Sequence, residues 1–241
     1  MIIIPDIHGR TFWKQAVRGR ENEKIVFLGD YTDPYFFEGI EQAEGLQSLK
    51  DVIDFKRHHA DNVVLLLGNH DLSYVSDYLT ECRHDYMNHG EICRLIHGNI
   101  SLFKIAHEQQ VGQKRFVFTH AGILPDWLKY NEPTLGGIDQ GHEVEVLNKL
   151  FYSGDLYPAL GDISFERGGT LNVGSCVWAD VNEHLDCSQD AGTSFGADVY
   201  QVFGHTLQLS GQPIVAPHFA CLDCRKAFLL DDDGEITDIK E

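Results

Sequence analysis

Five apolar runs in this chain are each followed by side chains that can bind a metal ion or move a proton. The five groups are Asp6-Ile7-His8, Gly29-Asp30, Gly68-Asn69-His70-Asp71, Thr119-His120 and Gly204-His205. Short apolar runs predict buried strands, and parallel strands bring their carboxyl ends to one edge of a sheet, where α/β proteins build their sites. We therefore expect these side chains to lie together. Their oxygen and imidazole ligands suit divalent ions such as Mn, Fe or Zn.

Asp30 is the expected link between two such ions. A carboxylate can offer one oxygen to each metal, and two ions about 3.5–4 Å apart both activate a water molecule and neutralise a phosphate group. The other expected ligands are Asp6 and His8 for the first ion, and Asn69, His120 and His205 for the second. The alternative interpretation is that strand-to-loop turns favour Gly, Asp and Asn for backbone reasons alone.

His70 is the expected general acid. It directly follows the expected ligand Asn69, which would place its imidazole near a bound phosphate, where it could protonate the leaving oxygen. Asp71 could then hold the tautomer of His70 as an orienting carboxylate. The alternative is a helix N-cap role for Asp71 and a surface position for His70.

The composition limits the partners that this chain can have. It contains 19 Lys and Arg residues against 37 Asp and Glu residues, a net charge of −18, so its field repels nucleic acid backbones and acidic membranes. General nucleic-acid binding and membrane binding are therefore not expected. A phosphate site in such a chain needs its own local cations, which two metal ions would supply. The expected partner is a phosphorylated small molecule or nucleotide.

The six cysteines occur in a chain too long to be a disulfide scaffold, which indicates a reducing compartment. The sequence enters a strand at once without a signal segment, and no run approaches the roughly 20 apolar residues of a membrane span. A cytoplasmic location is therefore expected. Cys221 and Cys224 form a lone C-x-x-C in an expected strand, where buried or inert cysteines are the expectation.

The first part of the chain alternates strands and helices. Strands are predicted over 2–4, 24–28 and 62–67, with helices over 11–18 and through Leu46 to a point near His59 between them. This β-α-β-α-β order predicts a parallel sheet with right-handed crossovers. Residues 72–113 are expected to be mainly helical, on an apolar stripe that extends from Ile92 to Ala106.

The rest of the chain is expected to hold strands around a long insertion. Strands are predicted over 114–118, 199–203, 213–215, 219–222 and 226–230, with a short last strand after the turn at 231–234. Residues 123–177 are expected to form a loop-rich insertion beside the active face, with one helix over 143–151. Consecutive strands indicate a second sheet packed on the first. We expect a single α/β domain over 1–241.

The motif series D-I-H-G, G-D-Y-T-D, G-N-H-D, T-H-A-G and G-H-T resembles that of the calcineurin-like metallophosphoesterase superfamily. It is most similar to the branch that holds phosphoprotein phosphatases and diadenosine tetraphosphate hydrolases. The resemblance implies the metallo-dependent phosphatase fold, a two-sheet β-sandwich flanked by helices. It also implies two divalent ions, most often Mn, with Fe, Zn or Mg as alternatives, bound by the ligand sets given above, and a general acid at His70.

The sequence departs from that branch at the residues that grip the substrate. Phosphoprotein phosphatases continue the second motif as Asp-Arg-Gly, and that arginine grips phosphate, but Asp33 is followed here by Pro34. Residues 190–196 lack the second phosphate-binding arginine of the branch. Arg10 and Arg167 are candidate substitutes, because a guanidinium can bind phosphate through two hydrogen bonds. The alternative is that both are solvated surface residues.

The sequence thus predicts a metal-dependent phosphatase that hydrolyses a phosphomonoester by attack of a metal-bridging hydroxide. One alternative is a phosphodiesterase or dinucleoside polyphosphate hydrolase on the same metal centre. Another is a catalytically silent metal-binding scaffold that recruits partners. The missing arginines favour the scaffold, whereas the presence of both Asn69 and His70 counts against it.

Overall fold

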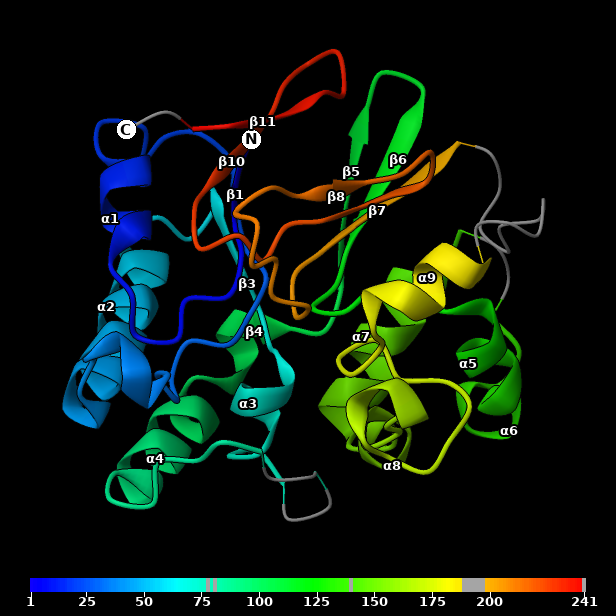
Figure 1. Ribbon diagram of the computed structural model, residues 1–241, viewed down its shortest axis with the longest axis horizontal. Helices are drawn as coiled ribbons and strands as arrows, with labels where there is room; N and C mark the ends of the chain where they lie inside the picture. The colour runs from blue at the N-terminus through cyan, green and yellow to red at the C-terminus, as the bar shows by residue number, and fades with distance from the viewer. Residues whose placement is uncertain (77–78, 80–81, 139–140, 188–197, 240–241) are drawn as a thin grey trace. The chain divides into compact units, whose positions relative to one another are not determined.

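The computed structural model describes residues 1–76, 79, 82–138, 141–187 and 198–239. Within them it has an α/β fold with two mixed sheets flanked by helices, which confirms the expected fold class (Figure 1). The chain divides into two compact units. Unit 1 joins residues 1–104 to residues 225–241, and unit 2 consists of residues 105–224. Each unit holds one of the sheets; the single domain stays a prediction.

The sheet of unit 1 has the strand order β11-β10-β1-β2-β3-β4. Four of its strands run parallel, and they are β1 (Ile2–Ile4), β2 (Ile25–Phe27), β3 (Val63–Leu66) and β4 (Phe103–Lys104). The antiparallel strands are β10 (Phe228–Leu230) and β11 (Ile236–Asp238). The predicted parallel arrangement of the first three strands is confirmed.

Helices connect the parallel strands of unit 1. They are α1 (Phe12–Val17), η1 (Phe36–Glu38), α2 (Gln42–His58), α3 (Asn69–Leu72), α4 (His89–Gly98) and η2 (Ile100–Leu102). Trp13 of α1 and Phe55 of α2 pack on Phe27 of β2, with ring centroids 5.5 and 6.4 Å apart. These aromatic contacts fix both helices to the strand that leads into Asp30.

The expectation of a mainly helical stretch over 72–113 is wrong, because after Leu72 the described residues of this stretch are helical only in α4 and η2. Helix α4 ends at Gly98, where the Asn99 side chain donates to the Leu95 carbonyl at 2.7 Å. Phe103 then pairs with β3, and β5 (His107–Val111) forms a hairpin with β6 (Lys114–Phe118) around Gly112 at φ 57°. Pairing with distant strands overrides the local helical pattern.

The sheet of unit 2 has the strand order β5-β6-β7-β9-β8. Its remaining strands are β7 (Val199–Phe203), β8 (Ile214–Val215) and β9 (Phe219–Cys221). β6, β7 and β9 run parallel, while β5 and β8 are antiparallel to their neighbours. The strands predicted over 114–118, 199–203, 213–215 and 219–222 are therefore present and form a second sheet. The strands predicted over 226–230 and after the turn at 231–234 are β10 and β11, which join the first sheet instead because β10 pairs with β1.

Residues 123–177 contain a series of short helices. Together with the helix that follows, they are α5 (Pro125–Tyr130), α6 (Glu132–Leu135), α7 (Glu143–Ser153), α8 (Tyr157–Leu160), η3 (Phe165–Arg167) and α9 (Val181–Cys187). The predicted helix is α7, which buries Val144, Leu147 and Phe151. A role for this stretch beside an active face stays a prediction.

Two further observations concern membrane-spanning helices and the cysteines. No helix in the described part of the chain combines the length and apolar composition of a membrane span. All six cysteines lie among the described residues, and Cys221 and Cys224 are buried, as expected.

Candidate metal centre

The sequence suggested that the five groups of candidate residues share one edge of a single sheet. The structure distributes them over two sheets. Three of them follow β1, β2 and β3 in unit 1, and two follow β6 and β7 in unit 2. The sequence shows where strands end but not which sheet each strand joins. The two parts are therefore described separately.

In unit 1, the loops after β2 and β3 meet at two glycines. Gly29 has φ 109°, and a Cβ at this position would lie 2.4 Å from the Gly68 nitrogen. Only glycine permits this approach at position 29, which explains why the second motif begins with it. The approach also brings the His70 N–H to Asp30 Oδ1, at 3.1 Å.

Three of the six expected metal ligands have a left-handed backbone. The φ angle is 44° at His8, 56° at Asp30 and 63° at His205. Such conformations are uncommon for residues other than glycine, and sparsely populated backbone conformations cost roughly 1–3 kcal/mol each and cluster at functional sites. In unit 1, the Asp30 carbonyl accepts hydrogen bonds from the Ile7 and His8 N–H groups, at 3.1 and 2.8 Å. These bonds hold the two loops in register.

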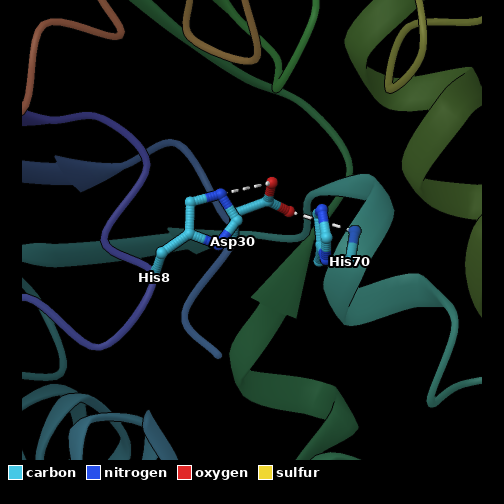
Figure 2. Close-up of side chains that lie close together, drawn as sticks. All are labelled: His8, Asp30 and His70. Atoms are coloured by element: carbon cyan, nitrogen blue, oxygen red, sulfur yellow. Dashed lines mark hydrogen bonds and ion pairs between the residues drawn. The ribbon is translucent and has the colours of Figure 1, made fainter. Parts of the chain in front are cut away.

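His8, Asp30 and His70 form a buried cluster (Figure 2). Their ligand atoms all lie within 4.8 Å of one another, and His8 Nε2 is 3.4 Å from Asp30 Oδ2. Two ligand atoms bound to one ion at about 2.0–2.3 Å lie roughly 3.0–3.5 Å apart. The spacing and the donor types therefore fit a divalent cation.

Burial sets the charges of this cluster. It lowers the pKa of His8 well below its usual value, and the neighbouring His70 and Arg83 add to the effect. Neutral His8 therefore keeps a lone pair for a cation. Burial also raises the pKa of Asp30 well above its usual value, and the carboxylates of Asp6 and Asp71 raise it further. A divalent ion would reverse this effect on Asp30 by supplying positive charge.

His70 is buried rather than on the surface. Its Nδ1 atom lies 3.1 Å from Asp33 Oδ2 and 2.9 Å from the Arg83 carbonyl oxygen. Burial alone would lower the pKa of His70, but the Asp30 carboxylate and the hydrogen bond to Asp33 outweigh it and raise the pKa. A histidine that holds its proton in this way suits a general acid.

Asp71 contacts the backbone, and the carboxylate bonded to the His70 ring is Asp33. Asp71 accepts hydrogen bonds from the N–H groups of Asp30, Gly68 and Tyr31, at 2.7, 2.9 and 3.0 Å. Asp33, which the Tyr74 hydroxyl holds in turn, is thus the carboxylate in contact with the His70 ring, and an orienting role of Asp71 stays a prediction. Asp33 and Asp71 each end one of the motifs, G-D-Y-T-D and G-N-H-D. The sequence alone therefore could not show which of the two contacts the His70 ring.

Asp6 and Asn69 occupy buried positions in unit 1. Asp6 follows β1 and lies near enough to Asp30 to raise its pKa. Asn69 is the first residue of α3, and its Nδ2 atom donates to Cys82 Sγ at 3.6 Å. The amide nitrogen is thus used for support, and the oxygen is the atom suited to a metal.

In unit 2, His120 and His205 face each other. His120 Nε2 lies 3.1 Å from His205 Nδ1, and Trp178 packs edge-on against the His205 ring. Two imidazole nitrogens at this separation also fit one shared ion.

A second buried histidine supports the turn that carries His120. His184 Nε2 donates to the Ala121 carbonyl at 3.0 Å, and a Cβ at Gly122 would lie 2.4 Å from that nitrogen. Burial lowers the pKa of His184 to about 4, so the ring is neutral at pH 7. Sequence reasoning assigned this histidine no role.

Arg10 and Arg167 are both held by carboxylates. Arg10 Nε and Nη2 each donate to the Glu38 carboxylate at 2.8 Å, in unit 1. In unit 2, Arg167 Nε pairs with Asp180 at 2.9 Å, and Nη2 donates to the Thr206 hydroxyl at 2.6 Å. Neither is a freely solvated surface arginine, and their roles in substrate binding stay predictions. Residues 190–196 lie outside the described part of the chain.

Arg83 is the residue that the sequence analysis missed. Its guanidinium carbon lies 3.6 Å from the centre of the Tyr35 ring, Nε donates to the Asp33 carbonyl at 2.7 Å, and Nη2 is 3.2 Å from His8 Nδ1. Within the described residues it pairs with no carboxylate, although Arg10, Arg115 and Arg167 all do. No motif marks Arg83, which follows His70 by 13 residues.

The sequence profile of the calcineurin-like phosphoesterase family matches residues 2–209. The chain therefore belongs to this family, and it is a metallophosphoesterase with a buried cluster of imidazole and carboxylate ligands.

Distant relatives are protein phosphatases. The chain is 26% identical over 155 residues to the serine/threonine-protein phosphatase 4 catalytic subunit of Kluyveromyces lactis, and 27% identical over 152 residues to that of Candida glabrata. Each match covers 59% of this chain and 44% of the relative, so the chain spans less than half of either protein's length.

A cold-active protein-tyrosine phosphatase from the psychrophile Shewanella sp. shares the fold. Its crystal structure aligns with 99% of this chain and 80% of its own, at a TM-score of 0.52 and 14% identity. At this identity the likeness concerns the fold alone.

Proposed function

We propose that this protein hydrolyses a phosphomonoester with two divalent ions. The buried pair of His8 and Asp30, with the His70 ring beside it, is the observation that carries the proposal. Asp6, His8 and Asp30 would hold one ion. Following the family motifs, Asp30, Asn69, His120 and His205 would hold the other. When bound, such ions supply an activated water molecule and positive charge against the phosphate. Manganese as the native metal and a cytoplasmic location are part of the proposal.

His70 protonates the leaving oxygen in this proposal. Its contacts with Asp33 and the Arg83 carbonyl fix the ring, and the Asp30 carboxylate and the Asp33 hydrogen bond, which outweigh burial, raise its pKa and so favour the protonated imidazole. Asp33 orients this proton donor. Asp71 acts as a positioning residue, because it holds the backbone of the loops that carry Asp30 and His70.

Arg83 grips the substrate phosphate in the proposal. In a chain with net charge −18, a half-buried guanidinium that pairs with no carboxylate among the described residues has capacity to bind an anion. Its contact with the His8 ring places that capacity beside the proposed metal cluster. A planar guanidinium can offer two parallel hydrogen bonds to phosphate oxygens. Arg10 and Arg167 would act as further contacts to the substrate.

The alternatives are a phosphodiesterase or dinucleoside polyphosphate hydrolase, and a scaffold without turnover. The similarity to the catalytic subunits of serine/threonine-protein phosphatase 4 supports the monoester. The ring of His70, held by Asp33 and the Arg83 carbonyl beside His8 and Asp30, supports turnover, since a scaffold has no need of a positioned proton donor.

The test compares p-nitrophenyl phosphate with bis-p-nitrophenyl phosphate, using metal-stripped protein with and without added Mn²⁺. We expect monoester hydrolysis that requires the metal and that falls by roughly 10²–10⁴-fold in His70→Ala, the range for a general acid. His58→Ala, an exposed histidine on α2, is the matched control. Preference for the diester would favour the first alternative. Activity that survives metal removal would refute the mechanism.

Arg83→Lys tests the phosphate contact. A charged hydrogen bond contributes about 1.5–3 kcal/mol, so KM for p-nitrophenyl phosphate should rise roughly tenfold or more, with less effect on kcat. Arg18→Lys, on the exposed end of α1, should change neither parameter. An unchanged KM in Arg83→Lys would remove this residue from the proposal without affecting the metal centre.

A further inference from the structure

Three arginines of unit 1 surround the ring of Tyr35, and they are Arg10, Arg83 and Arg225. Their guanidinium carbons lie 5.6, 3.6 and 5.9 Å from the centre of this ring, within the range of a cation–π contact. The Tyr35 ring also packs edge-on against the His8 ring, with centroids 5.1 Å apart. The three arginines therefore gather beside the proposed metal cluster.

A single carboxylate, that of Glu38, forms ion pairs with this group of arginines in the described part of the chain. It accepts hydrogen bonds from Arg10 Nε and Nη2, each at 2.8 Å, and lies 2.7 Å from Arg225 Nη2. Burial alone would raise the pKa of Glu38, but the hydrogen bond from Arg10 and the charges of the three arginines outweigh it and lower the pKa. Three positive charges thus accompany one negative charge, in a chain whose net charge is −18.

The Arg225 guanidinium is the least satisfied of the three. Its Nε atom is buried and has no hydrogen-bond partner among the described residues, a cost that a purely structural ion pair would avoid. Nη2 is held by Glu38, and the side chain is 35% exposed. Because a guanidinium carries five N–H donors, Arg225 keeps donors for an anion that approaches from solvent.

The backbone of Arg225 is left-handed as well, with φ 60°. Five residues other than glycine have a positive φ in the described part of the chain. Three of them are expected metal ligands, and the fourth, Asp33, contacts the His70 ring. Sparsely populated backbone conformations cluster at functional sites, so this fifth position indicates a functional role for Arg225.

We propose that Arg225 binds a second phosphate group of the substrate, while Arg83 and the metal centre hold the phosphate that is hydrolysed. A guanidinium can bind phosphate through two parallel hydrogen bonds, and Arg10 and Glu38 position that of Arg225. The inference rests on the proposed function. In a phosphomonoester the organic part is the leaving alcohol, so the second phosphate belongs to the leaving group. The substrate class is therefore a small bisphosphate.

The test compares two ligands that cannot be hydrolysed, propane-1,3-diphosphonate and propylphosphonate, which differ by one phosphonate group. Titration calorimetry measures both on full-length protein loaded with Mn²⁺. We expect the diphosphonate to bind at least about tenfold more tightly to the wild type, the effect of one charged hydrogen bond. In Arg225→Gln the preference should fall to about twofold, the statistical factor for two equivalent ends.

Lys226→Gln is the matched control, because it removes the same charge at the next position, from a side chain that pairs with Asp238. It should keep the tenfold preference of the wild type. Both ligands are measured on every variant, so a folding defect would lower both affinities together instead of changing their ratio.

A preference of about twofold or less in the wild type would overturn the inference, and so would a tenfold preference that survives in Arg225→Gln. Hydrolysis of p-nitrophenyl phosphate by the same wild-type preparation separates this inference from the proposed function. Hydrolysis without the preference would overturn the bisphosphate inference alone. The preference without hydrolysis would contradict the proposed function and still support the phosphate contact of Arg225.

Discussion

The proposed ligands in unit 1 and those in unit 2 are held in place by different electrostatic means. In unit 1, the carboxylate of Asp71 accepts hydrogen bonds from backbone N–H groups in the loops after β2 and β3. In unit 2, the neutral imidazole of His184 donates to the turn after β6. A negatively charged carboxylate therefore holds the loops of unit 1, and a buried uncharged ring holds the turn of unit 2. The two supports should therefore fail under different conditions.

Glycine substitutions should give the largest effects. Gly29→Ala combines a positive φ, which costs about 1–2 kcal/mol, with a clash against Gly68 that adds about 1–3 kcal/mol. Gly122→Ala meets the His184 ring, a side chain that can shift, so its cost should be smaller than that of Gly29→Ala. Urea unfolding would measure both.

Gly19→Ala is the matched control, because Gly19 has φ 74° but nothing within 4 Å of an added Cβ. It should lose only the backbone contribution of about 1–2 kcal/mol. Equal losses in Gly19→Ala and Gly29→Ala would contradict the close approach of the two loops in unit 1.

Acid should weaken the support in unit 2 through His184. Its folded pKa of about 4 is below the usual value near 6.5, so the unfolded chain binds the extra proton first. The stability that this neutral ring contributes is complete above pH 6.5 and is lost as the pH falls to 4. The loss should reach about 3 kcal/mol.

The measurement is the free energy of unfolding of metal-free protein at pH 7 and pH 4, for the wild type and His184→Gln. Glutamine keeps a donor but cannot titrate, so the variant should show a smaller loss between the two pH values. The same pH dependence in both proteins would mean that His184 is not the group that titrates.

Asp71→Asn should give the smallest effect, on metal binding in unit 1. Asparagine keeps the shape but removes the charge that attracts three backbone N–H groups. Loss of such a supporting partner weakens metal affinity roughly 10–100-fold, which titration calorimetry with Mn²⁺ would detect. Asp54→Asn, an exposed carboxylate on α2, is the control. Unchanged affinity in Asp71→Asn would show that the glycine contact alone positions the loops.

Local patterns in the sequence predict the elements around the candidate site well. Apolar runs ending in Gly-Asp or Gly-Asn-His predict β2 and β3 and the turns that follow them, because the signals for strand and turn lie next to each other. The parallel pairing of β1, β2 and β3 follows from the alternating helices.

Contacts between distant residues could not be predicted in this way. β4 contains two residues and forms only because it pairs with β3. Its residues have no strand pattern of their own, and the helical apolar stripe from Ile92 to Ala106 therefore included them by mistake. Asp33, rather than Asp71, contacts the His70 ring because of the path of the loop after β2. Arg83 reaches His8 across 75 positions of sequence and carries no motif.

The pairing of β1 with β10 has a consequence for biosynthesis. Met1 N bonds to the Leu230 carbonyl, 229 positions further along the chain, so β1 lacks its neighbour β10 until the ribosome has added about that many residues. At about 5–20 residues per second, this wait lasts roughly 10–45 s. Until then, a β1 strand that has paired with β2 has one unpaired edge, which is a site for aggregation. Nascent chains of this protein should therefore depend on chaperones that shield the segment of β1.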